Sequence, residues 1–219
     1  MKHYLNPLFA PQSVAVIGAS DRPQSVGRLV YTNLLNGKFK GTLYAVNPKH
    51  SEILGRPAYP TIQAIGKPIE LALSVTPPAA GASVIDSCGA AGVKAAVIIT
   101  AGFAETGEAG VKLQHELMEH AKNHGIRIIG PNCLGIMRPS IGLNATFSKS
   151  GAKAGGLAFV SQSGALCTAI LDWAQSAGIG FSTVVSMGDA ADLDFGEILD
   201  YLLGDPETNS ILLYIEGIR

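Results

Sequence analysis

The first turn in this sequence with the residue types of a ligand-binding loop consists of Gly18, Ala19 and Ser20. They follow the apolar, β-branched run of residues 13–17 and precede a predicted helix. A glycine lets the backbone approach a ligand closely, and the N–H groups that open a helix can bind a pyrophosphate. Only Gly18 fits the G-x-G-x-x-G pattern of dinucleotide-binding loops, so a turn without a ligand remains the alternative.

Lys49 lies where a dinucleotide-binding enzyme carries an acidic residue, just after the second predicted strand. An acidic residue at that place accepts hydrogen bonds from a free ribose hydroxyl, whereas a lysine pairs with a phosphate. Pro48 stiffens the turn before it. This exchange disfavours NAD and favours an adenosine with an extra phosphate, as in coenzyme A, although a lone loop lysine is often simply solvated.

Ser161, Gln162, Ser163 and Gly164 form a second turn between a predicted strand and a predicted helix. Two hydroxyl groups and the N–H groups of a helix N-terminus can together bind a phosphate. A serine N-cap followed by a closely packed glycine explains the same residues without a ligand. Glu216 ends the last predicted strand, where a carboxylate can orient a histidine, act as a base or simply be solvated.

Other polar residues give weaker signals. Cys133 has no base near it in the sequence, so Asn132, which both donates and accepts hydrogen bonds, is the better candidate for a site residue. His120 and His124 have the spacing of a metal pair but no third ligand nearby, so no metal site is predicted. Three aspartates lack the spacing of a calcium loop and are expected near a helix N-terminus: Asp189, Asp192 and Asp194.

The elements that position these residues are short β-branched runs that alternate with helical patterns, which predicts the α/β class with a parallel sheet. Strands are predicted at residues 14–18, 43–46, 71–75, 95–100 and 127–129. Helices are predicted at residues 25–35, 78–89 and 108–124, the last capped by Thr106 and ended by Gly125. Because parallel strands end at one edge, the residues after the third and fourth strands should lie beside Gly18.

This alternation stops after residue 132, and residues 137–156 are predicted to be a loop-like linker. A second unit then follows, with strands at residues 157–160, 181–186 and 211–215 and helices at residues 165–177 and 195–203. We therefore expect two domains, residues 1–148 and residues 149–219. Three strands make a small parallel sheet, so the second domain is expected to be truncated.

The composition is that of a globular protein with a sizeable core: 219 residues, 47% of them hydrophobic and 15% charged, with a net charge of −1. This balance argues against nucleic acid and anionic membrane as partners. No run approaches the roughly 20 apolar residues of a membrane span, and the first residues lack an apolar signal core. Cys88, Cys133 and Cys167 are odd in number and far apart, which is typical of reduced thiols and predicts a cytoplasmic location.

Five motifs together resemble those of the nucleoside-diphosphate-forming acyl-CoA synthetases, relatives of the succinyl-CoA synthetase α subunit and of ADP-forming acetyl-CoA synthetases. They occur in family order over essentially the whole chain, at residues 11–20, 47–49, 129–135, 160–164 and 214–217. The resemblance implies a Rossmann-like CoA-binding domain followed by a flavodoxin-like, succinyl-CoA synthetase-like domain. It also implies part of an acid–thiol ligase that forms ADP and works through an acyl phosphate and a phosphohistidine.

The turns described above and the resemblance together assign candidate roles. The candidates for CoA binding are Gly18, Ala19, Ser20, Val26, Lys49, Val75, Pro77, Ile99, Thr100, Ala101 and Asn132. The resemblance implies a phosphate site at Ser161, Gln162, Ser163 and Gly164. It also implies a catalytic role for Glu216, which would steady the phosphorylated histidine.

The chain departs from the family pattern at its end. The family's histidine lies in a glycine-rich loop beyond the matching Glu-Gly pair, and this sequence stops three residues after Glu216. An ATP-grasp domain or subunit, which would bind ATP, ADP and Mg²⁺, is also expected elsewhere. This stretch should therefore bind CoA without completing the reaction with the acyl substrate. The alternative is an acyl-CoA-sensing region of a bacterial protein lysine acetyltransferase, and a homo-oligomer is compatible with either function.

Overall fold

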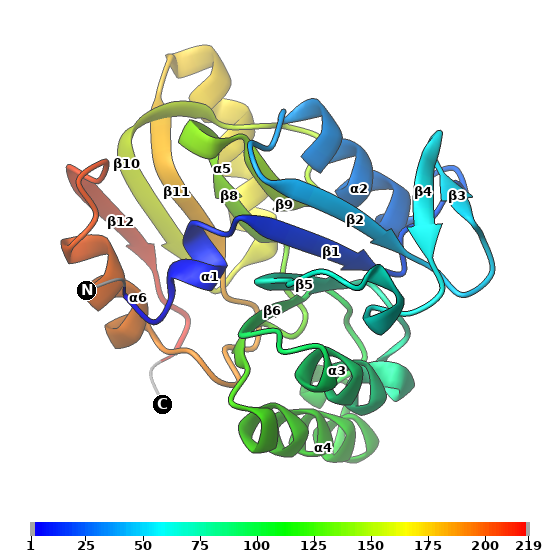
Figure 1. Cartoon of the computed structure of the whole chain (residues 1–219). Helices are drawn as coiled ribbons and strands as arrows, with labels where there is room; N and C mark the ends of the chain where they lie inside the picture. The colour runs from blue at the N-terminus through cyan, green and yellow to red at the C-terminus, as the bar shows by residue number, and fades with distance from the viewer. Residues whose placement is uncertain (1–2, 218–219) are drawn as a thin grey trace.

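The computed structural model, which describes residues 3–217, contains two β-sheets side by side, each with helices packed on its faces (Figure 1). The strands of the seven-stranded sheet follow the order β3-β4-β2-β1-β5-β6-β7. Those of the five-stranded sheet follow the order β12-β10-β11-β8-β9. The α/β class predicted from the alternating strand and helix patterns is therefore confirmed.

The first sheet is built from short apolar runs. Its strands are β1 (Ser13–Ile17), β2 (Thr42–Val46), β3 (Glu52–Ile53), β4 (Arg56–Tyr59), β5 (Leu71–Ser74), β6 (Ala95–Ile98) and β7 (Arg127–Ile129). All neighbours pair in parallel except β3 and β4, a short antiparallel hairpin at the edge that the sequence patterns did not predict. The carboxyl ends of β1, β5 and β6 consequently meet at one edge, as expected.

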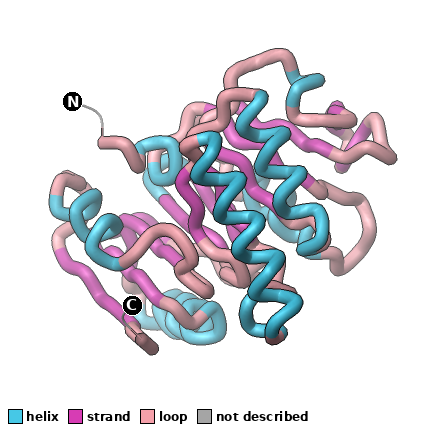
Figure 2. The backbone as a smooth tube through the Cα atoms, turned by 90° about the horizontal axis from the view of Figure 1, so that it is seen from below, coloured by secondary structure: helices cyan, strands magenta, loops and turns pink. Residues whose placement is uncertain are grey.

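Helices cover both faces of this sheet (Figures 1 and 2). The side chains of α1 (Asn6–Phe9) and α2 (Val26–Asn36) pack on one face. Those of α3 (Gly81–Ala90) and α4 (Glu108–His124) pack on the other. Four short 3-10 helices within the described residues connect these elements: η1 (Gln63–Ile65), η2 (Pro78–Ala80), η3 (Ala104–Thr106) and η4 (Pro139–Ile141).

Local sequence explains most of the helix ends. The Ser25 hydroxyl accepts the Arg28 N–H at 3.2 Å and caps α2. Gly125 ends α4 in the left-handed conformation, with φ +63°. The prediction that Thr106 caps α4 is wrong, because its hydroxyl donates to the Phe103 carbonyl at 2.8 Å and Gly107 occupies the N-cap position.

The second sheet begins earlier than the sequence predicts. Its strands are β8 (Gly135–Arg138), β9 (Leu143–Thr146), β10 (Lys153–Ser161), β11 (Gly180–Ser186) and β12 (Ser210–Tyr214), with helices α5 (Gly164–Ala177) and α6 (Phe195–Leu203) between the last three. The predicted linker at residues 137–156 is therefore wrong, since β8 and β9 form an antiparallel hairpin paired to β11. The domain division at residue 148 remains a prediction.

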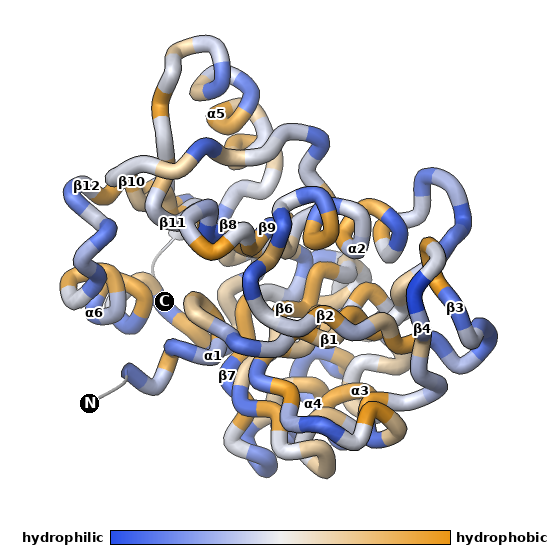
Figure 3. The backbone as a smooth tube through the Cα atoms, turned by 45° about the horizontal axis from the view of Figure 1, so that its top comes forward, coloured by the Kyte–Doolittle hydropathy of each residue, from blue (hydrophilic) through white to orange (hydrophobic). Residues whose placement is uncertain are grey.

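One apolar core joins the two sheets. Buried side chains of β1 and α2, such as Val16 and Leu34, belong to the same cluster as Ile136, Val160 and Ile198 of the second sheet and α6. A second cluster lies under α3 and α4, and a third lies under α5. Figure 3 shows the hydrophobic residues concentrated on the inner strands and on the helix faces turned toward them. The shared cluster fixes the two sheets relative to each other.

Ion pairs reinforce this junction. Arg127 on β7 contacts Asp192 at 2.9 Å and Glu197 of α6 at 2.8 Å. Asp192 also accepts the Ile128 N–H at 2.7 Å; it lies three residues before α6, near a helix N-terminus as expected, but its side chain pairs with β7 instead of capping the helix. The same expectation is confirmed for Asp194, whose side chain caps α6 through the Glu197 N–H at 2.9 Å.

The remaining polar clusters outside the cavity have structural partners. His120 and His124 both contact Asp86, at 2.7 Å and 3.1 Å. Between residues 3 and 217, no group of three or more His, Cys, Asp and Glu side chains is arranged to hold a metal. In the same residues, no helix is long and apolar enough to cross a bilayer.

Candidate functional site

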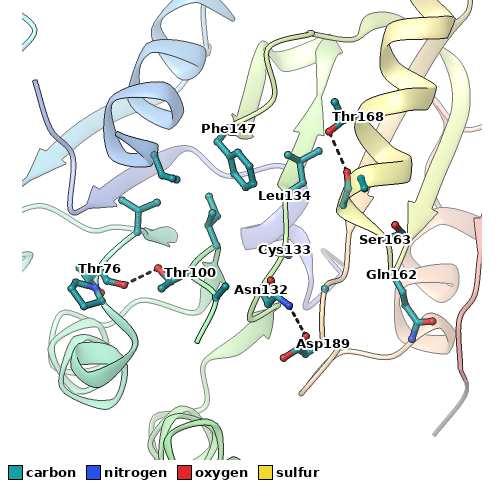
Figure 4. A pocket seen from close by; sticks show the side chains of 18 of the residues that line it. Thr76, Thr100, Asn132, Cys133, Leu134, Phe147, Gln162, Ser163, Thr168 and Asp189 are labelled. Atoms are coloured by element: carbon teal, nitrogen blue, oxygen red, sulfur yellow. Dashed lines mark hydrogen bonds between the residues drawn. The ribbon is translucent and has the colours of Figure 1, made fainter. Parts of the chain in front are cut away.

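A cavity of about 870 Å³ lies between the carboxyl edge of the first sheet and the start of α5 (Figure 4). Eleven of the predicted site residues line it: Val26, Val75, Pro77, Ile99, Thr100, Ala101, Asn132, Gln162, Ser163, Gly164 and Glu216. Five predicted site residues do not: Gly18, Ala19, Ser20, Lys49 and Ser161. The topology thus brings residues separated by up to 190 positions in the sequence to one cavity.

One wall of the cavity consists of the loops that follow β5 and β6. Backbone hydrogen bonds extend the sheet into these loops. The Val75 N–H donates to the Ile17 carbonyl at 3.0 Å, and the Ile99 N–H donates to the Ser74 carbonyl at 3.1 Å. The Thr100 hydroxyl donates to the Thr76 carbonyl at 2.7 Å and ties the two loops together (Figure 4). The wall is therefore a hydrogen-bonded continuation of the sheet.

The turn after β1 supports the cavity from behind. Gly18 has a φ of +94°, and its N–H donates to the Val46 carbonyl at 2.9 Å. A Cβ atom at Gly27 would lie 2.1 Å from the Gly18 carbonyl oxygen, so only glycine lets α2 pack this closely on the turn. The turn thereby presents Arg22 and Val26, rather than its glycine, to the cavity.

Lys49 lies outside the cavity wall, on the loop after β2. Asn47 connects that loop to the first turn, because its side chain donates to the Ala19 carbonyl at 2.7 Å and accepts the Lys49 N–H at 2.8 Å. The backbone of Lys49 is thus fixed near the turn after β1, while its side chain is exposed.

Asn132 and Asp189 lie between the two halves of the cavity. The Asn132 N–H donates to Thr100 at 3.0 Å, and its side chain donates to the Asp189 carboxylate at 3.2 Å (Figure 4). Asp189 also interacts with Glu105. Burial alone would raise the pKa of Glu105, but hydrogen bonds from the backbone N–H groups of Gly102, Glu105 and Phe103 lower it below its ordinary value, with a smaller contribution from Asp189.

The start of α5 forms the opposite wall. The Ser163 hydroxyl caps the helix by accepting the Leu166 N–H at 3.3 Å. The buried Ser161 hydroxyl accepts the Ser163 N–H at 3.0 Å and donates to the Ser163 carbonyl at 2.9 Å. Ser161 therefore shapes the turn from behind, and the N–H groups of the first helical turn are directed at the cavity, where they suit an anion.

Glu216 follows β12 and lies at the rim of the cavity, with Gln162 beside it. The Glu216 N–H donates to the Gln162 side-chain oxygen at 2.6 Å. A carboxylate and a helix N-terminus therefore share one end of the cavity. The helix N-terminus can bind an anion, and the carboxylate can pair with a cation or accept a proton beside it.

Cys133 lines the cavity but is unsuited to act as a nucleophile. It is 3% exposed, and burial raises the pKa of its thiol to about 12. We expect iodoacetamide at pH 8 to alkylate Cys133 in the folded protein roughly a hundredfold more slowly than an exposed cysteine, because only the thiolate reacts. Mass spectrometry of the labelled peptides measures this, and protein unfolded in guanidinium is the control. Rapid labelling of the folded protein would contradict the assignment.

Two further lining residues, Arg22 and Thr76, lie in residues 20–26 and 75–77, the stretches where the family resemblance implies contacts with CoA. Other lining residues were not among the predicted site residues: Cys133, Leu134, Phe147, Ala165, Thr168, Gly188 and Asp189. Asp189 had been assigned only to a helix end, and its neighbour Asn132 is 57 residues away in the sequence, which no local pattern reveals.

Two protein-family models match the chain in succession. Residues 12–139 match the CoA binding domain, and residues 154–219 match the succinyl-CoA ligase like flavodoxin domain. The chain belongs to the family of CoA-binding domains, in the two-domain arrangement of nucleoside-diphosphate-forming acyl-CoA synthetases. This confirms the family and the fold that the five sequence motifs predicted.

Relatives of known activity are similar over almost the whole chain. Acetate–CoA ligase [ADP-forming] I of Archaeoglobus fulgidus is 47% identical over 212 residues, which cover 97% of this chain and 31% of that protein. The α subunit of acetate–CoA ligase [ADP-forming] II of Pyrococcus furiosus is 45% identical over 98% of this chain and 47% of that subunit.

The structural comparison agrees. The dinucleotide forming acetyl-coenzyme A synthetase 1 of Ca. Korarchaeum cryptofilum, solved in complex with phosphate and ADP, has a TM-score of 0.94 and 41% identity. It covers 98% of this chain, which in turn covers 46% of that protein. The chain thus spans less than half the length of each of these three relatives.

Proposed function

We propose that this chain is the CoA-binding portion of an ADP-forming acyl-CoA ligase that works through a phosphohistidine located outside residues 1–219. The observation that carries the proposal is the single cavity, in which the loops after β5 and β6 face the N-terminus of α5 and Glu216. A thioester or thiol held by the loops and a phosphate held by the helix would meet there. That is the encounter that acyl transfer between CoA and phosphate requires.

The proposed roles follow from position. The loops at Val75–Pro77 and Ile99–Ala101, with Val26 and Asn132, would hold CoA along the first wall. Gly18, Ala19 and Ser20 would act from behind by shaping the turn, and Ser161 would do the same for the phosphate site. Ser163 and Gly164 would bind phosphate through the helix N-terminus, and Glu216 would orient the histidine.

The remaining parts of the proposal concern partners. ATP, ADP and Mg²⁺ would bind to an ATP-grasp domain or subunit, as the family resemblance implies, and not to this portion. The cysteines at positions 88, 133 and 167 are free and buried, which supports a reducing, cytoplasmic location. The acetyltransferase alternative receives no support from the relatives above, which are named as ligases or a synthetase.

Calorimetric titration of the purified chain with CoA and with NAD tests the proposal. We expect saturable binding of CoA and none of NAD, because the loop after β2 carries Lys49 in place of a ribose-binding acid. Saturable NAD binding without a response to CoA would overturn the proposed function.

We expect Lys49→Ala to weaken CoA binding about tenfold or more and to leave dephospho-CoA binding nearly unchanged. A charge-assisted contact contributes about 1.5–3 kcal/mol, and each 1.4 kcal/mol is about tenfold in affinity. The Asn47 side chain bridges the Lys49 N–H and the Ala19 carbonyl and so holds the lysine backbone beside the first turn. Equal losses for the two ligands would show that Lys49 does not contact the 3′-phosphate.

A further inference from the structure

The side chain of Gln162 forms three hydrogen bonds with the segment that follows β12. Its oxygen Oε1 accepts the N–H groups of Glu216 at 2.6 Å and of Gly217 at 3.0 Å. Its nitrogen Nε2 donates to the Gly217 carbonyl at 3.0 Å. Both polar atoms of the amide are thus engaged by the backbone of residues 216–217. Figure 4 shows the side chain extending away from the start of α5, where the proposed phosphate site lies.

This side chain continues the pairing of two strands beyond their ends. Ser161 on β10 is in register with Tyr214 on β12, and the Gln162 N–H donates to the Tyr214 carbonyl at 3.2 Å. The chain then turns into α5, so β10 offers no further backbone to pair with residues 216–217. The Gln162 amide, which carries one acceptor and one donor group as a peptide does, takes that place.

The segment has few other anchors. Ile215 is 43% exposed, and Glu216 and Gly217 are exposed. Among residues 3–217, Gln162 supplies the hydrogen bonds that Glu216 and Gly217 make. Among the described residues, this side chain therefore makes the hydrogen bonds that direct Glu216 as the chain leaves the sheet.

We propose that Gln162 is a positioning residue that holds the Glu216 carboxylate at the rim of the cavity, and that its side chain does not itself bind phosphate. The inference rests on the proposed function, because it assigns the amide a task within that site. It separates Gln162 from Ser163 and Gly164, which would contact phosphate through the N-terminus of α5.

Amide hydrogen exchange in the purified chain tests the geometry. We expect the Glu216 and Gly217 amides to be protected about tenfold or more, and Gln162→Met, which keeps the shape but lacks the acceptor, to abolish this protection. Gln162→Glu retains an oxygen acceptor for both N–H groups but loses the donor to the Gly217 carbonyl, so it should restore the protection in part. Gln175→Met, at an exposed glutamine of α5, is the matched control and should change nothing at residues 216–217. Unprotected amides in the unmodified chain would overturn the proposal.

A double-mutant cycle with inorganic phosphate tests the consequence at the site. We expect Glu216→Gln to raise the affinity for phosphate about threefold or more, because it removes a negative charge held close to the bound anion. In the Gln162→Met background the same change should alter the affinity by less than about twofold, because the segment is no longer fixed. An equal effect in both backgrounds would overturn the proposal.

The two experiments also separate this inference from the proposed function. Unchanged CoA affinity in Gln162→Met, with the coupling to Glu216 lost, is the result expected if both hold. If the unmodified chain binds CoA but Glu216→Gln changes the phosphate affinity equally with and without Gln162, the positioning role alone is rejected. Absence of both CoA and phosphate binding would reject the proposed function, and with it the role of Gln162.

Discussion

Replacing Arg138 by methionine should lower the free energy of unfolding by about 3–5 kcal/mol, the usual cost of breaking a buried ion pair from one side. Arg138 on β8 contacts Asp205 at 2.6 Å and Glu207 at 3.1 Å. The side chains of Arg138 and Asp205 are only 8% and 2% exposed. Without the guanidinium, the Asp205 carboxylate would be buried with no cation beside it. Urea unfolding followed by circular dichroism measures the loss.

The pH dependence of this loss has a definite sign. Burial alone would raise the pKa of Asp205, but hydrogen bonds from Arg138 and Thr208 lower it below the ordinary value of an aspartate. The pair therefore contributes fully above the unfolded-state pKa of about 3.9 and is lost as pH falls through the lower folded-state value. We expect the difference between Arg138→Met and the unmodified protein to narrow in acid.

A matched control is Lys40→Met, because Lys40 donates to the Ser140 carbonyl at 2.7 Å from an exposed position. We expect this exposed contact to contribute less than about 1 kcal/mol. A similar loss for both variants, or a loss below about 1 kcal/mol for Arg138→Met, would contradict the assignment of a buried pair.

Gly27→Ala should destabilise the protein by about 3 kcal/mol and weaken CoA binding about tenfold or more. The added Cβ would lie 2.1 Å from the Gly18 carbonyl oxygen, a backbone atom that cannot rotate away. Either α2 or the turn after β1 must shift, and both support Arg22 and Val26 at the cavity. Thermal unfolding and calorimetric titration with CoA measure the two effects.

Gly151→Ala is the control for this change. The nearest atom to its new Cβ would be the Asn144 side-chain nitrogen at 3.9 Å, an ordinary contact. We expect a stability change within about 0.5 kcal/mol and unaltered CoA affinity. If Gly27→Ala behaved like this control, the close packing of α2 on the first turn would not be needed for the site.

The hydrophobic pattern of the sequence predicted the elements in which burial alone decides where the apolar residues stand. The central strands β1, β5 and β6 are buried throughout, and α4 and α6 have the predicted bounds. The hairpin of β8 and β9 was missed because Pro139 and Gly142 suggest a loop and its strands are only four residues long. β8 is stabilised by pairing with β11, in which Val184 lies opposite Met137, 47 residues earlier, and β9 pairs with β8; local sequence shows neither partner.

For the candidate site, the sequence predicted those cavity-lining residues that directly follow strands. Val75, Ile99 and Ser163 follow strands, so their place at the cavity is a consequence of parallel topology. Gly18 and Ser161 were predicted to bind the ligand but do not line the cavity; the Gly18 backbone and the Ser161 hydroxyl instead make contacts that shape the turns leading to Val26 and Ser163. Long-range partners such as Asp189 and Glu105 become neighbours only once the two sheets have packed together.

The apolar core shared by the two sheets has a consequence for how ligands reach the cavity. Swinging one domain away from the other would expose buried side chains such as Val16 and Val160 to water at a cost of about 25 cal/mol per Å² of apolar surface. A hinge opening at this junction is therefore unfavourable, and both domains should unfold in one cooperative transition. CoA must enter through the mouth of an already assembled cleft, so its affinity carries no penalty for domain closure.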